Sequence, residues 1–142
     1  MKLVEELEKA RDEMISWRRH LHEHPEVAYN EKDTADFVAA KLESFGVEVH
    51  RGFGGTGLVG VIRGKSDGGS IGLRADMDAL PMSEETNLPY ASKRPGAMHA
   101  CGHDGHTTML LGLLLQQTAA AGARTQQPHV FMILSDDVVR GH

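Results

Sequence analysis

Residues 99–107 read HACGHDGHT, a stretch crowded with side chains that can bind a metal ion or move a proton. Thiolate and imidazole are good ligands for zinc and other divalent transition metals. Cys101 and His103 are two residues apart, so in an extended segment both side chains would project to the same side. Gly102 and Gly105 let the backbone bend around a bound ion. Cys101 and His103 are therefore candidate metal ligands.

Two ligands do not hold a metal ion tightly, because a working site uses at least three protein groups. The sequence offers Asp76, His99 and Asp104 as candidates for the others. His106 and Thr107 are expected to open a helix, whose N-terminus favours a nearby thiolate, aspartate or substrate carboxylate.

Cys101 is the one cysteine of the chain, and two other interpretations of it stay open. Neighbouring histidines and a helix start could favour the thiolate and make it a nucleophile. However, a base two residues away in an extended segment is badly placed to take the thiol proton. A free structural cysteine is the other interpretation.

A second group of ionisable residues is the ADMD sequence at positions 75–78. Asp76 and Asp78 follow an apolar stretch that reads as a strand. Carboxylates just beyond the C-terminal end of a strand lie where open α/β sheets place their ligands. Alternatively, the aspartate pair only begins a turn, since Pro81 follows closely.

Two further motifs are interpreted as structural. His20 and His24 are four residues apart and could share a helix face, but position 21 is leucine where a helical zinc motif would have glutamate. We therefore expect solvated or helix-capping histidines there. The glycine-rich residues 52–60 lead into a strand and lack a following lysine, which indicates a turn and not a phosphate loop.

The elements that position these groups follow from the hydrophobic pattern. Apolar residues recur every three or four positions in 2–24, which predicts one helix there. A second helix is expected to start after Asn30 and to stop at Gly46. Its inward face is expected to hold Phe37, Val38, Leu42 and Phe45. Strands are predicted at 47–51, 57–64, 70–76 and 129–134, a long irregular loop at 79–105, and a buried helix at 106–121. The predicted fold class is therefore α/β, with a mixed sheet flanked by helices.

Composition narrows the classes of partner. The chain has 142 residues and a formal net charge of −5, which argues against nucleic-acid binding through a basic surface. No signal peptide is visible, and the longest apolar run, residues 109–115, is far shorter than a membrane span. A single cysteine is compatible with a reducing compartment. We therefore expect a cytoplasmic chain with neither a nucleic-acid nor a membrane partner.

Three separated motifs resemble the metal-dependent amidohydrolases that include hippurate hydrolases, N-acyl-L-amino-acid amidohydrolases and auxin-conjugate hydrolases. They are WRRHLHEHPEVAYNEKDTADFV, GLRADMDALPMSEETNLPYAS and GAMHACGHDGHTTMLLG, which together run from about Trp17 to Leu115. The resemblance implies the N-terminal part of a zinc-carboxypeptidase-like catalytic domain. It also implies a site for two divalent ions (zinc, manganese, cobalt or nickel) with Cys101 and His103 as ligands.

The resemblance assigns roles to the aspartates as well. The residue matching Asp78 orients or tunes the metal environment in that family. Asp76 takes the place of a metal-binding histidine found in more distant relatives. The family's next strand runs into a Pro-Ala-Glu-Glu motif that carries the general base, whereas here Asp136 and Asp137 follow, without the preceding Pro-Ala.

Residues 1–142 are accordingly expected to form a partial catalytic domain without a lid or dimerisation domain, with 116–142 as a divergent tail. The implied activity is hydrolysis of the amide bond of N-acyl amino acids such as hippurate by a metal-activated water, in a weakly active or inactive chain. The alternative is a non-catalytic metal-binding or interaction module in which Asp136 or His129 completes the site. An exposed sheet or helix surface could support self-association.

Overall fold

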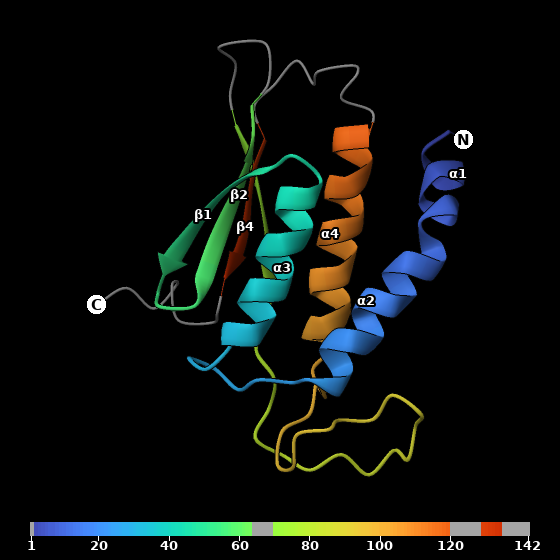
Figure 1. Cartoon of the computed structure of the whole chain (residues 1–142), viewed down its shortest axis with the longest axis vertical. Coiled ribbons are helices and arrows are strands. Elements are labelled where there is room, and N and C mark those ends of the chain that lie inside the picture. The colour runs from blue at the N-terminus through green and yellow to red at the C-terminus, as the bar shows by residue number, and fades with distance from the viewer. Residues whose placement is uncertain (1, 64–69, 120–128, 135–142) are drawn as a thin grey trace.

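The computed structural model describes residues 2–63, 70–119 and 129–134, which form helices packed against a mixed sheet (Figure 1). The elements in chain order are α1 (Lys2–Lys9), α2 (Arg11–Glu23), α3 (Lys32–Ser44), β1 (Glu48–Phe53), β2 (Gly57–Ile62), β3 (Ile71–Asp76), α4 (His103–Ala119) and β4 (His129–Leu134). Asp136, Asp137 and much of the expected tail at 116–142 lie outside the described residues.

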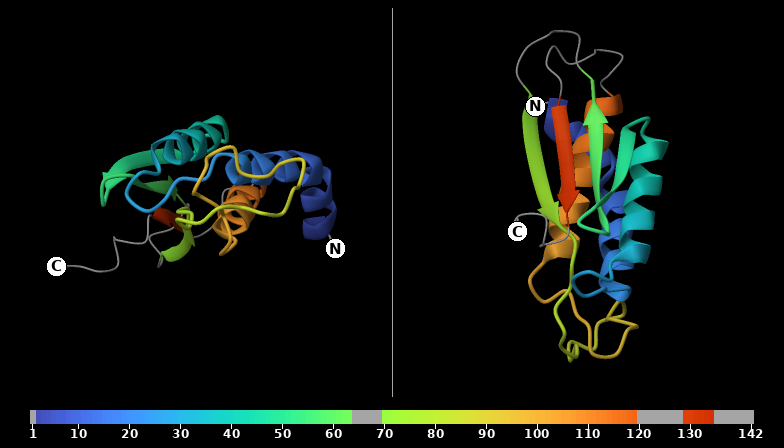
Figure 2. Two further views of the ribbon diagram at one scale, coloured as in Figure 1. Left: turned by 90° about the horizontal axis from the view of Figure 1, so that it is seen from below. Right: turned by 90° about the vertical axis from the view of Figure 1, so that its left-hand side faces the viewer.

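The sheet has the strand order β1-β2-β4-β3. β1 pairs with β2 and β2 with β4 in antiparallel fashion, whereas β3 and β4 run parallel. The α4 helix lies between β3 and β4 in sequence, as parallel neighbours require a crossover connection. The helices gather on one face of the sheet (Figure 2), so the mixed α/β architecture predicted from the sequence is confirmed.

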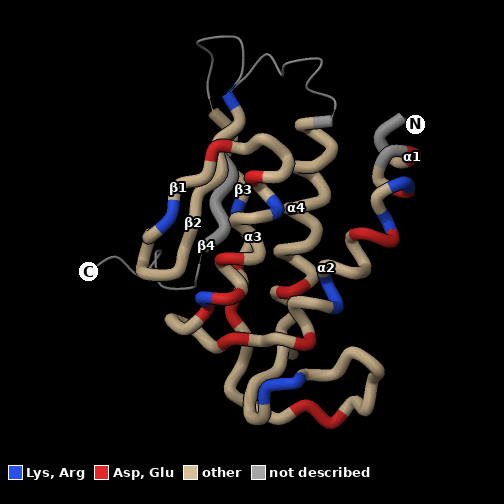
Figure 3. The backbone as a smooth tube through the Cα atoms, in the orientation of Figure 1, with Lys and Arg blue, Asp and Glu red and all other residues tan. Residues whose placement is uncertain are grey.

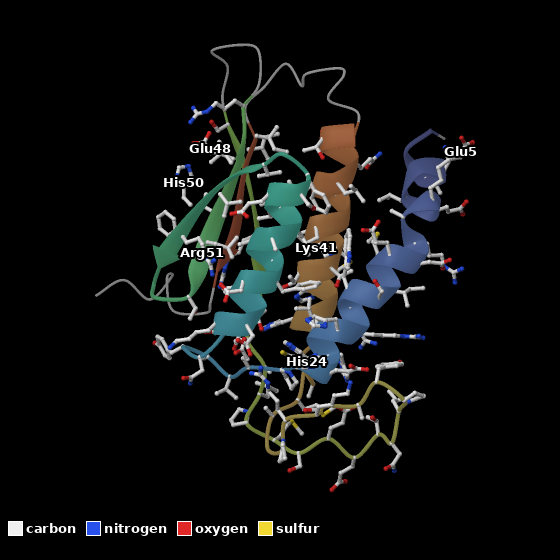
Figure 4. The ribbon with its side chains drawn as sticks, viewed as in Figure 1. Glu5, His24, Lys41, Glu48, His50 and Arg51 are labelled. Carbon is white, nitrogen blue, oxygen red and sulfur yellow. The ribbon has the colours of Figure 1, made fainter. Side chains whose placement is uncertain are left out.

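The core lies between that face and the helices. Trp17 of α2, Leu42 of α3 and Leu111 of α4 are almost completely buried in it. Val38 is also fully buried, as predicted, while Phe37 and Phe45 are only partly covered. Lys41 lies across the Trp17 ring, with its Nζ 5.2 Å from the ring centroid (Figure 4).

Close packing of α3 on the sheet depends on a glycine in β2. A Cβ atom at Gly60 would lie 3.0 Å from Val47 Cγ1 and 3.3 Å from Leu42 Cδ1. Both neighbours are buried, so a side chain at position 60 would push α3 away from the sheet.

Three predicted helix boundaries are wrong. The single helix expected over 2–24 is broken at Ala10, whose N–H donates to Leu7 O at 3.1 Å in a tight turn. The α3 helix has Glu31, not Asn30, at its N-cap position. The α4 helix begins at His103 and not at His106, because the His106 N–H already donates to the Gly102 carbonyl oxygen at 3.1 Å.

Charged residues of both signs are interspersed along α1, α2 and the loop between β3 and α4 (Figure 3). Within the described ranges, every helix is too short or too polar to cross a membrane.

The start of α3 is anchored by Glu26, a residue that sequence reasoning passed over. Its carboxylate accepts hydrogen bonds from the N–H groups of Asp33 (3.2 Å) and Thr34 (2.7 Å), which have no partner within the helix. Arg94 Nη1 contacts the same carboxylate at 3.0 Å. The Glu26 carbonyl also accepts the Ala79 N–H at 2.7 Å, so this residue ties α3 to the segment that follows β3.

We expect Glu26→Ala to lower the free energy of unfolding by about 1–3 kcal/mol, because it leaves the N–H groups of Asp33 and Thr34 without an acceptor and removes one of the two carboxylates that pair with Arg94. Urea denaturation of the two proteins measures the difference. Glu23→Ala is the matched control, since Glu23 only pairs with Lys93 at the surface and should cost much less. Equal losses for the two variants would contradict the capping role.

Candidate metal centre

Asp78 brings the predicted ligands together at the C-terminal end of β3. Its Oδ1 lies 2.9 Å from His103 Nδ1, and its carbonyl oxygen lies 3.1 Å from the same nitrogen. The Cys101 Sγ lies 4.0 Å from that carbonyl oxygen. Asp78 is 6% exposed, whereas Cys101 is exposed. The Cys101 sulfur and the His103 imidazole therefore both lie next to Asp78, just beyond the C-terminal end of β3.

The Asp78 contact determines the tautomer of His103. A carboxylate only accepts hydrogen bonds, so Nδ1 of His103 carries the proton and donates it. The Nε2 atom of that ring then has its lone pair available for a ligand. A histidine that binds a metal through one nitrogen and donates the other N–H to a carboxylate is the common arrangement in metalloproteins. The geometry thus suits His103 to the role the sequence predicts.

The route by which Cys101 and His103 meet differs from the prediction. They do not lie in one extended segment, because α4 begins at His103. Gly102 between them has φ +89°, in the left-handed region that side chains with a Cβ rarely adopt. A glycine turn followed by a helix start therefore brings the two side chains to Asp78.

Asp76 is not part of this group in the described structure. Its carboxylate pairs with Arg74 on the same strand. Its carbonyl oxygen accepts a hydrogen bond from Thr107 Oγ1 at 3.1 Å, which fastens the first turns of α4 to the end of β3. Asp76 thus positions α4 through its backbone.

Asp104, another candidate ligand, is turned into the protein. Its Oδ2 lies 2.7 Å from His22 Nδ1 and 2.9 Å from Arg18 Nε, and the residue is 1% exposed. The other nitrogen of His22 lies 3.1 Å from Glu84 Oε1. The structure therefore corrects the assignment of Asp104 as a candidate metal ligand. Asp104 belongs to a buried ionic network and not to the Cys101–His103 pair.

Sequence reasoning missed His22, which lies between His20 and His24 and pairs with the buried Asp104 and Glu84 carboxylates. The signal available was its position next to Leu21 on the buried side of α2, where a polar residue needs a partner. The prediction for its neighbours fits the structure: His24 ends α2, and its Nδ1 lies 2.8 Å from the His20 carbonyl oxygen.

His99 is the third candidate, and it is buried with an exposed fraction of 4%. Neither ring nitrogen has a hydrogen-bond partner among the described residues. Burial lowers the pKa of His99 to about 4, although the nearby Asp104 carboxylate acts in the opposite direction. His99 is therefore a neutral imidazole at physiological pH, which is the form that binds metals and accepts protons.

The donor types fit a divalent transition metal, but their number falls short. Cys101 and His103 supply one sulfur and one nitrogen, and no three metal-ligating side chains converge within the described part of the chain. His129 cannot complete the site, because it pairs with Ile71 at the opposite end of β3 from Asp76, roughly 16 Å away at about 3.3 Å per residue. The ligand roles of Cys101 and His103 stay predictions.

The buried, neutral state of His99 predicts an acid-dependent loss of stability. In the unfolded chain His99 takes up a proton near pH 6.5, but in the folded chain only near pH 4. Stability is therefore lost as the pH falls from 6.5 towards 4, by on the order of 3 kcal/mol for this group. We expect His99→Gln to flatten the pH dependence of the unfolding free energy in that window, measured without metal. Parallel curves for both proteins would contradict it.

The chain is similar in sequence to a peptidase family and to known amidohydrolases. Residues 72–137 match the family model for peptidase family M20/M25/M40. The chain is 52% identical over 111 residues to a hippurate hydrolase of Campylobacter jejuni, and 50% identical over 107 residues to an N-acyl-L-amino acid amidohydrolase of Geobacillus stearothermophilus. These matches cover 78% and 75% of this chain, but 29% of each relative.

The solved structures include the YxeP protein of Bacillus subtilis, described as a dinuclear metal-binding peptidase of the M20 family. It superimposes with a TM-score of 0.84 at 38% sequence identity, over 91% of this chain and 36% of YxeP. The α/β fold thus matches the N-terminal part of the catalytic domain in that family. This chain is thus similar to peptidase family M20/M25/M40 in sequence and to the N-terminal part of an M20 peptidase in structure.

Proposed function

We propose that this chain is the N-terminal part of the catalytic domain of a metal-dependent amidohydrolase that cleaves N-acyl amino acids. The observation that carries the proposal is the Asp78–His103 hydrogen bond of 2.9 Å beside Cys101. It leaves His103 Nε2 available as a ligand next to a thiol. Identity of about 50% to a hippurate hydrolase and an N-acyl-L-amino acid amidohydrolase supports the substrate class.

Each residue has a defined task in this proposal. A bound divalent ion would supply a water activated for attack on the acyl carbonyl. Cys101 and His103 would hold that ion, with Asp78 fixing the His103 tautomer and ring orientation. A mixed sulfur and nitrogen donor set suits zinc, manganese, cobalt or nickel. The chain spans about three-tenths of the curated relatives, so the activity and substrates of the whole protein remain proposals.

Cobalt(II) titration tests the metal site, because thiolate-bound cobalt gives a near-ultraviolet charge-transfer band. We expect Cys101→Ser to abolish this band, since serine does not supply a thiolate. Asp78→Ala should weaken binding about 10- to 100-fold, as loss of an outer-shell partner of a metal-bound histidine does. His50→Gln is the control, because His50 is exposed on β1, where its ring pairs with the Glu48 carboxylate. Unchanged cobalt binding by Cys101→Ser would contradict the proposed site.

Hydrolysis gives a separate test of the amidohydrolase assignment. The 142-residue chain alone should bind cobalt weakly and should not release glycine from hippurate, because its described residues bring only two ligands together. Tight, stoichiometric binding without hydrolysis would favour the alternative of a non-catalytic metal-binding module. Turnover by the purified chain that is lost in Cys101→Ser would show a complete site and contradict the expected weak activity.

We also propose that the chain self-associates through its open sheet edge. Among the described strands, β3 is at one edge of the sheet, and Ile71 at its start is 48% exposed. An unpaired edge strand offers N–H and C=O groups to another chain. Sedimentation velocity over a range of concentrations would detect the resulting dimer.

A further inference from the structure

A buried ionic network includes Asp104, the residue next to His103 in α4, and His22 is at its middle. The His22 ring nitrogens lie 2.7 Å from Asp104 Oδ2 and 3.1 Å from Glu84 Oε1. The side chains of all three residues are no more than 4% exposed. Buried charges are costly unless paired, and here each charged side chain has a partner.

We propose that His22 is a positioning residue of the metal centre: held between Asp104 and Glu84, it fixes the first turn of α4 and thereby the orientation of His103. The inference rests on the proposed function, because His103 is a metal ligand only in that proposal. The contacts themselves come from α2, the loop before α4 and α4.

His22 lies between two carboxylates, and carboxylates only accept hydrogen bonds. An imidazole ring carries at least one N–H, so His22 donates to at least one of them. The Arg18 guanidinium lies 2.9 Å from the Asp104 carboxylate and 3.4 Å from His22 Nδ1. The network thus joins two side chains of α2 to carboxylates of α4 and of the preceding loop, and it acts as a polar cross-link.

On the α4 side, the cross-link reaches His103 through its immediate neighbour. Asp104 is the second residue of α4, and besides His22 it accepts a hydrogen bond from the Gly105 N–H at 2.9 Å. Its carbonyl oxygen accepts one from Thr108 Oγ1 at 2.8 Å. The side chain and backbone of Asp104 are therefore both fixed, and the helix start that aims His103 at Asp78 cannot rotate without breaking them.

On the other side, the cross-link reaches the loop that carries Cys101. Glu84 Oε2 accepts the Ser92 N–H at 2.6 Å, and Glu84 also binds the Thr86 hydroxyl. One carboxylate thus joins two stretches of the loop to α2 through His22. The loop and the helix that supply the two predicted metal ligands are both held by the His22 ring.

Nitrogen-15 NMR of histidine in the metal-free 142-residue chain tests the inference. In the unsubstituted protein we expect His103 to be the Nδ1–H tautomer and His22 to show a hydrogen-bonded ring N–H. In His22→Gln, the His103 ring should shift to the tautomer mixture of a free histidine. His24→Gln is the matched control, because His24 is two residues away at the C-terminal end of α2 (Figure 4) and outside the network, and it should leave His103 unchanged.

Cobalt affinity provides a second readout. His22→Gln should weaken cobalt binding about 10- to 100-fold, as loss of outer-shell support does, and His24→Gln should not. If His22→Gln does not fold, judged by circular dichroism, Glu84→Gln replaces it with the same expected direction. The Asp104→Asn and His22→Gln double variant should be no worse than the single variants, since both break one cross-link.

The results separate the two proposals. A folded His22→Gln protein with an unchanged His103 tautomer and cobalt affinity would overturn the positioning role, even if cobalt binds through Cys101. A His103 tautomer that depends on His22 would support the positioning role, even if the unsubstituted chain binds no cobalt and the proposed function fails.

Discussion

The hydrogen bond between Asp78 and His103 joins the end of β3 to the start of α4, and the candidate site is built around it. The two residues are 25 positions apart, and the intervening loop must bring the chain back to the same edge of the sheet. The parallel register of β3 and β4 sets where that edge lies, and α4 spans the distance between them. One contact of 2.9 Å therefore couples the sheet, the loop and the helix to the orientation of a single imidazole.

Buried polar groups, more than apolar ones, hold this edge of the molecule in place. Glu26 caps α3 and binds the segment after β3 through its carbonyl oxygen. His22 links α2 to Asp104 at the start of α4 and to Glu84 in the loop. Hydrogen bonds and ion pairs have strict geometry, whereas apolar contacts are non-directional. Buried polar groups therefore suit a site whose side chains need fixed orientations. The apolar core around Leu42 and Leu111 packs the helices against the sheet.

Periodic patterns predicted the elements well, and the reason is physical. The strand at 129–134 and the mixed sheet were predicted because apolar runs and alternation follow directly from burial. Cys101, His103 and Asp78 could be singled out because thiol, imidazole and carboxylate groups are the side chains that bind transition metals. Helix boundaries were less predictable: the left-handed Gly102, whose carbonyl oxygen accepts the His106 N–H, places the start of α4 at His103, and such local geometry has no periodic signature.

Spacing within one segment could not predict the surroundings of Asp104, His129 and His99. Asp104 was a reasonable ligand candidate until the structure paired it with His22, 82 positions away. His129 was a candidate until the strand register placed it opposite Ile71. Both facts depend on tertiary arrangement, which a spacing within one segment does not contain. The same limit applies to His99, whose burial lowers its pKa without any local sign of it.

X-ray absorption spectroscopy of the zinc-bound chain tests the central claim most directly, because it reports the atoms around the ion and their distances. Coordination by Cys101 and His103 predicts a sulfur shell near 2.3 Å and a nitrogen shell at about 2.0–2.1 Å that shows imidazole scattering. The sulfur shell should disappear in Cys101→Ser. A first shell of nitrogen and oxygen alone in the unsubstituted chain would contradict the claim that Asp78 assembles a thiolate and an imidazole into one metal site.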